Sequence, residues 1–95
     1  MHIKWSMNKY MVSKIKIIKK PQKFMCDYIA VNGHLPKNEL PMRMRKMHKN
    51  TIYIRSNICK NNPKRMNRII RHEKREMMFI EHGYSYKNAH KKAGY

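Results

Sequence analysis

The chain has 95 residues, which is enough for one small domain with a modest core. It carries 23 lysines and arginines against 5 acidic residues, a formal net charge of +18. No apolar run approaches the roughly 20 residues of a membrane span. So many like charges repel one another, and a polyanion relieves that repulsion while its own counterions are released. Nucleic acid is therefore the partner that we expect, and an anionic membrane surface is the weaker alternative.

Residue usage bears on the origin of the protein. Lysine (16), isoleucine (11), methionine (10) and asparagine (9) dominate, as in proteins with A/T-rich codons and in many organelle genomes. This favours a mitochondrial matrix protein, and a protein of an A/T-rich bacterium or archaeon is the alternative. Cys26 and Cys59 form no C-x-x-C pair, so we expect reduced thiols and no thiolate zinc knuckle. Residues 1–26 are acid-free, but they are rich in lysine and poor in serine, so we interpret them as mature protein rather than a transit peptide.

The first third of the chain interleaves basic and apolar residues. The stretch around 12–18 fits a strand by alternation and a basic helix by composition, and we favour a helix that ends at Pro21. Residues 24–31 are apolar enough to pack on another element. Asn32-Gly33 indicates a turn.

The middle of the chain predicts an extended path. Pro36 and Pro41 forbid a regular helix between them, so residues 34–50 should be an extended segment that carries arginines to RNA phosphates, or else a surface loop. Residues 51–54, Thr-Ile-Tyr-Ile, are β-branched and aromatic and predict a strand.

The clearest predicted element is a helix over about 63–82. Asn62 can cap it, and Pro63 suits its first position, where the missing N–H costs nothing. Gly83 marks its end. A short basic helix over 86–93 should follow.

The long helix is amphipathic at helical spacing. Its apolar face carries two acids among hydrophobic residues: Met66, Ile69, Ile70, Glu73, Glu76, Met77 and Ile80. Its other face is basic: Asn67, Arg68, Arg71, Lys74 and Arg75. This division suits a helix that packs on a core and lies against phosphates. Ser85 can cap the following short helix, which ends at Gly94.

The long helix also suggests an enzyme hypothesis. His72-Glu73-x-x-Glu76 resembles the H-E-x-x-H pattern of zinc peptidases with glutamate as the second ligand, and His90 could complete the triad of a small zinc hydrolase. The simpler interpretation is that Glu73 and Glu76 pair with nearby lysines or arginines. Because no G-x-S-x-G, P-loop or Rossmann glycines occur, we expect no enzyme and no cofactor. A free-standing DNA-binding protein is a further alternative.

Three motifs, in order, resemble a ribosomal protein family. The segment 35–45 (LPKNELPMRMR) looks like L-P-[RK]-[DN]-x-x-P-x-R-x-R. The helix matches S-R-I-x-x-R-E at Arg71, Arg75 and Glu76, and the end 91–95 (KKAGY) looks like K-K-A-S-W. On these motifs, residues 35–95 resemble small-subunit ribosomal protein fourteen of bacterial and organellar type.

The sequence departs from the motifs of this family at several places. The family's T-G pair is missing from residues 57–65, and about eleven residues would be inserted after Arg45. The chain has no C-x-x-C pairs, so it resembles the zinc-free branch of the family.

The resemblance implies a structural constituent of the small ribosomal subunit that binds rRNA in the subunit head beside neighbouring head proteins, with no membrane and no small-molecule substrate as partner. The implied fold is mainly α with extended loops, a small irregular basic protein ordered in part only when bound to rRNA. A divergent helical region would occupy 1–34, and an rRNA-binding loop and helices would occupy 35–95. The predicted RNA-binding residues are basic or carry the terminal aromatic ring: Arg43, Arg45, Lys46, Arg55, Lys60, Lys64, Arg65, Arg68, Arg71, Arg75, Lys91, Lys92 and Tyr95.

Overall fold

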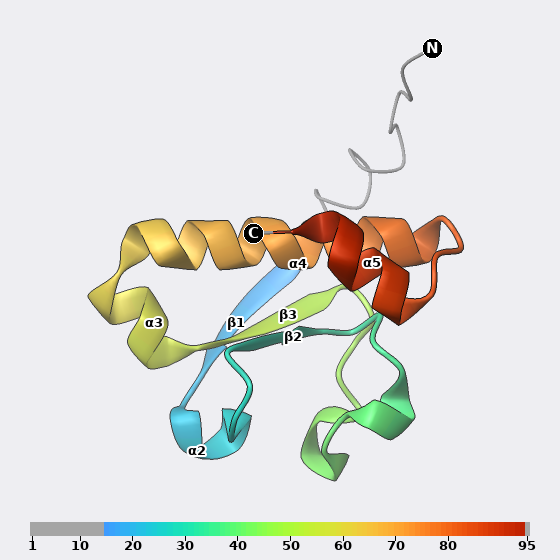
Figure 1. The fold of residues 1–95 in the computed structure, drawn as a ribbon. Helices are drawn as coiled ribbons and strands as arrows, with labels where there is room; N and C mark the ends of the chain where they lie inside the picture. The colour runs from blue at the N-terminus through green and yellow to red at the C-terminus, as the bar shows by residue number, and fades with distance from the viewer. Residues whose placement is uncertain (1–14, 95) are drawn as a thin grey trace.

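A three-stranded mixed sheet lies at the centre of the protein (Figure 1). The computed structural model describes residues 15–94. The strands are ordered β1 (Lys16–Lys20), β3 (Thr51–Arg55) and β2 (Ala30–Asn32), with the short helix α2 (Gln22–Met25) between β1 and β2 in the chain. β1 runs parallel to β3, and β2 runs antiparallel to it. The strand predicted over 51–54 is confirmed, and it is the central one.

Three helices follow the sheet in the chain: α3 (Ser56–Asn61), α4 (Pro63–Glu81) and α5 (Tyr86–Ala93). α4 lies across one face of the sheet and α5 packs beside it (Figure 1). The predicted caps of α4 and α5 are confirmed, because the side chains of Asn62 and Ser85 accept backbone N–H groups from Arg65 and Asn88. Within residues 15–94, none of the helices has the length and apolarity that crossing a membrane requires.

Each face of the sheet covers its own small core. Ile52 and Ile54 of β3 point toward the helices, where Ile52 meets Met77 and Ile54 meets Ile69. Because side chains alternate along a strand, Tyr53 points the other way. On that face it packs on a second cluster formed by β2, α2 and the segment that follows β2: Met25, Val31, Leu35, Leu40, Met44 and Met47.

The predicted fold class, mainly α with extended loops and partly ordered only on rRNA, is wrong. The described chain is a compact α/β domain, 54% helical and 16% strand. The error begins at the stretch around 12–18, where we favoured a helix: residues 16–20 form β1, and 12–14 lie outside the described residues. Isoleucine favours strands, and pairing with β3, far along the chain, decides the outcome. Composition alone contains no information about that partner.

The segment 34–50 is also folded rather than extended. It forms two short 3₁₀ helices, Lys37–Glu39 and Met42–Met44, each immediately preceded by a proline. Pro36 and Pro41 do exclude a long helix, but their fixed φ also suits the position before a tight turn. Leu35, Leu40, Met44 and Met47 are buried, so the segment closes the second core.

The turn predicted at Asn32-Gly33 brings two backbones into contact. A Cβ at Gly33 would collide with the backbone carbonyl of His48, so only glycine leaves room for this approach. The Gly33 N–H donates to the carbonyl oxygen of Thr51 at 3.0 Å. This contact places Asn32, at the end of β2, under α4.

Candidate nucleic-acid interface

Three arginines of α4 line one groove. Arg68, Arg71 and Arg75 are exposed and recur at helical spacing. Together with His72 and with Ala93 and Gly94 at the end of α5, they enclose a hollow of about 190 Å³. We call this hollow the arginine groove. The basic stripe that helical periodicity predicted is therefore combined with a second wall, supplied by α5.

The carboxylates of α4 do not neutralise this groove. Glu73 and Glu76 are buried on the sheet side of the helix, at 5% and 1% exposure. Glu81, at the far end of α4, lies 3.7 Å from His34. The groove therefore presents guanidinium groups that can bind phosphate in a bidentate manner.

The other predicted basic residues of the helical half lie near the element ends. Lys60 is in the last turn of α3, Lys64 and Arg65 begin α4, and Lys91 and Lys92 are in the last turn of α5. All five are exposed. Cations at the end of α5 also interact favourably with the negative end of its dipole. These residues extend the positive surface beyond the arginine groove, along the helical side of the sheet.

The basic residues of the central segment lie apart from the arginine groove. Arg43, Arg45 and Lys46 line a separate open hollow. They belong to the segment between β2 and β3, which lies on the side of the sheet away from α4 (Figure 1). The Nε groups of Arg43 and Arg45 donate to the carbonyl oxygens of Phe24 and Leu40, each at 2.8 Å. We predicted that both side chains would reach along RNA from an extended chain; the structure uses part of each guanidinium to hold the folded segment.

Arg55 has a comparable structural contact. It is half-buried at the end of β3, and its Nη2 donates to the carbonyl oxygen of Cys26 at 3.0 Å. Tyr95, the last of the predicted binding residues, lies outside the described residues. The predicted RNA-binding residues therefore fall into three groups. Some line the arginine groove, some are exposed near the ends of helices, and some hold the fold together through hydrogen bonds to backbone carbonyl oxygens.

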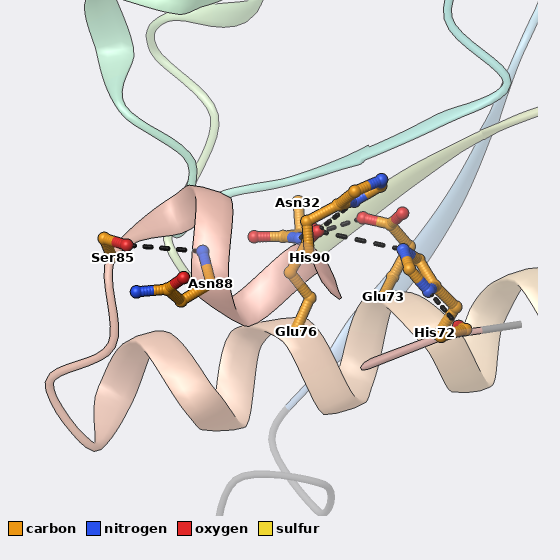
Figure 2. A network of polar contacts seen from close by, with 8 residues as sticks. Asn32, His72, Glu73, Glu76, Ser85, Asn88 and His90 are labelled. Atoms are coloured by element: carbon orange, nitrogen blue, oxygen red, sulfur yellow. Dashed lines mark hydrogen bonds and ion pairs between the residues drawn. The ribbon is translucent and has the colours of Figure 1, made fainter. Parts of the chain in front are cut away.

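A buried polar cluster lies between α4 and the sheet (Figure 2). It shares His72 with the arginine groove. The side-chain amide of Asn32, 0% exposed, donates to Glu73 Oε1 at 2.8 Å and to Glu76 Oε1 at 2.9 Å. We expected lysine or arginine partners for these two acids. Within residues 15–94 their contacts come instead from Asn32 and from histidines of α4 and α5.

Burial has a large effect on Glu73. Removal from water, and secondly the nearby Glu76 carboxylate, raise the pKa of Glu73 to about 8, while the hydrogen bond from Asn32 acts in the opposite direction. Glu73 is therefore largely protonated at neutral pH, which avoids two adjacent buried charges.

The histidines and the glutamate of the proposed triad do come together. His72 Nε2 lies 3.7 Å from Glu76 Oε2, and His90 Nδ1 lies 2.7 Å from the same oxygen. The imidazole rings of His72 and His90 meet edge to face, with centroids 5.0 Å apart. The Nδ1 of His72 contacts the carbonyl oxygen of Gly94. This cluster therefore joins α4 to the C-terminal end of α5.

The residue that sequence reasoning missed is Asn32. Its neighbour Gly33 marked it as a turn residue, and its side chain does bond locally, accepting the N–H of His34 at 2.9 Å. Its contacts with Glu73 and Glu76 span more than forty residues of sequence and have no local pattern. Comparison of the chain with protein families, with curated proteins and with solved structures gave no match.

Proposed function

We propose that this protein is a structural rRNA-binding component of a small ribosomal subunit, acting in the mitochondrial matrix. The observation that carries the RNA-binding part is the arginine groove: three exposed guanidinium groups on one helix face, with the helix's inner carboxylates turned away beneath it. The formal net charge of +18 supplies the long-range attraction. Binding without catalysis is the role that such a groove supports.

The assignment to the small subunit has a separate basis. It depends on the ordered motifs at 35–45, in α4 and at 91–95, which resemble small-subunit ribosomal protein fourteen. Two of the motif residues, Arg71 and Arg75, line the arginine groove. The mitochondrial assignment depends on the A/T-type residue usage. Neighbouring head proteins and rRNA are the proposed partners.

The groove can be tested by titrating the purified chain with head-domain rRNA at a series of salt concentrations. Replacing Arg68, Arg71 and Arg75 together with glutamine should weaken binding. Log K falls as log salt rises, and each lost phosphate contact makes that slope shallower by roughly 0.7–0.9. The slope of the triple variant should therefore be shallower than that of the wild type by about 2–3. All three side chains are exposed, so the fold should survive, which circular dichroism can check.

A charge-matched control separates the groove from general electrostatics. Lys19, Lys23 and Lys49 are exposed and lie outside the arginine groove. Their triple replacement with glutamine removes the same charge, and it should retain most of the affinity and slope. Equal losses in the two variants would contradict the groove as the binding site. Tighter, sequence-specific binding to duplex DNA than to rRNA would support a DNA-binding protein instead.

A further inference from the structure

We propose that His72, Glu76 and His90 bind one Zn²⁺ ion that fastens α5 to α4. His72 and Glu76 lie one helical turn apart on α4, and His90 reaches them from α5 (Figure 2). One ligand atom from each residue lies within 4.8 Å of the other two. The three residues come from α4 and α5, which are joined by a turn that contains Gly83. A bound ion would therefore cross-link the two helices.

The surrounding contacts already orient these ligands. The carbonyl oxygen of Gly94 can only accept, so the Nδ1 of His72 that contacts it carries the proton. The lone pair of the ring is then on Nε2, the atom that faces Glu76 Oε2 at 3.7 Å. On the other side, Asn32 donates to Glu76 Oε1 and leaves Oε2 directed at both histidines. Outer contacts of this kind, imidazole to carbonyl and carboxylate to amide, are typical of metal ligands in proteins.

The donor set selects the kind of metal. Two imidazole nitrogens and one carboxylate oxygen suit Zn²⁺, whereas Mg²⁺ and Ca²⁺ prefer oxygen ligands alone. Zinc bonds of about 2.0–2.1 Å in tetrahedral geometry place neighbouring ligand atoms about 3.3 Å apart. The distance of 3.7 Å between His72 Nε2 and Glu76 Oε2 is close to that value. The 2.7 Å contact between His90 and Glu76 has to open slightly.

Exposure at His90 allows that adjustment. Its side chain is 55% exposed, whereas those of His72 and Glu76 are 1% and 2% exposed. An ion can therefore enter from the His90 side, and water can occupy a fourth position. We infer binding and not hydrolysis, because Glu73, the residue that would act as general base, is buried and accepts from Asn32.

The test is to titrate the purified full-length chain with Zn²⁺ against a chromophoric chelator, and in parallel with Co²⁺. The wild-type chain should bind one equivalent of zinc and should give the intense visible absorption of tetrahedral cobalt. His90→Gln should weaken zinc binding on the order of tenfold or more and abolish the cobalt band. Because His90 is exposed, this variant should fold, and far-ultraviolet circular dichroism can verify that it does.

His48→Gln is the matched control. His48 is exposed in the segment before β3 and belongs to a different contact, with the N–H of Asn50. It should bind zinc like the wild-type chain. A wild-type chain without stoichiometric zinc, or a His90→Gln variant that binds as well as His48→Gln, would overturn the proposal and leave a cluster held by hydrogen bonds alone. Because RNA takes no part in this measurement, its outcome is independent of the rRNA-binding proposal.

Discussion

At the scale of single residues, the polar cluster shows how a small core accommodates charge. Asn32, Glu73 and Glu76 are at most 5% exposed, yet they lie among apolar side chains that supply the folding free energy. Burying a carboxylate is tolerated when hydrogen bonds satisfy it, or when it takes up a proton. Glu76 has three polar contacts in the cluster, whereas Glu73 has the amide of Asn32 and a pKa raised to about 8.

The protonation of Glu73 predicts how stability depends on pH. Its pKa is about 8 in the folded chain against an ordinary value of 4.5, so the unfolded chain releases the proton first as pH rises. Its contribution to stability is therefore greatest below about pH 4.5 and falls between there and pH 8. Glutamine does not titrate, so Glu73→Gln removes this pH-dependent loss of stability, and its side-chain oxygen can still accept a hydrogen bond from Asn32. The melting temperature of this variant should exceed that of the wild type at pH 8, and the two should converge near pH 4.

The control for this prediction is Asp27→Asn, which changes an exposed acid just after α2. Both melting curves should be recorded with a chelator present, so that metal binding does not contribute. A Glu73→Gln variant that is less stable than wild type at pH 8 would show that the carboxylate is charged and favourably bound in the folded chain.

At the scale of elements, the local rules succeeded where the determining contacts are local. Asn62, Pro63 and Ser85 bounded two helices correctly, because capping involves residues only three positions apart. The strand predicted over 51–54 was visible from its β-branched and aromatic residues, and β3 extends it by one residue. β1 was not visible, since its partner lies thirty-five residues away. The same reasoning applies to the site: spacing revealed the arginine stripe, but only the folded chain shows that α5 forms its second wall.

The side-chain cap of α4 should contribute measurably to the stability of the fold. The Asn62 side chain accepts the Arg65 N–H at 3.0 Å, and Asn62→Ala removes that acceptor. The expected cost is about 1 kcal/mol, which lowers the melting temperature of a chain this short by roughly 4–8 °C. Asn67→Ala, an exposed position within the same helix, should leave the melting temperature nearly unchanged. Equal effects at both positions would contradict the capping role.

At the scale of the whole molecule, the fold reconciles a small core with an extreme charge. Its apolar residues form clusters on both faces of a three-stranded sheet, and most of its lysines and arginines lie at the surface. Residues 15–94 are therefore more compactly folded than composition suggested. The described residues of the protein present basic areas on both sides of the sheet, the arginine groove on the helical side and the hollow near Arg43 on the other. A protein with basic areas on both sides suits a partner that surrounds it, as folded rRNA does.

The proposed ribosomal function can be tested by sedimentation of the native protein from its source, through a sucrose gradient after a salt wash, with immunoblotting of each fraction. We expect the protein to travel with the small ribosomal subunit and to survive the wash, because arginine–phosphate contacts buried within folded rRNA would be screened less by salt than exposed ones. Recovery at the top of the gradient with free proteins would contradict the ribosomal assignment.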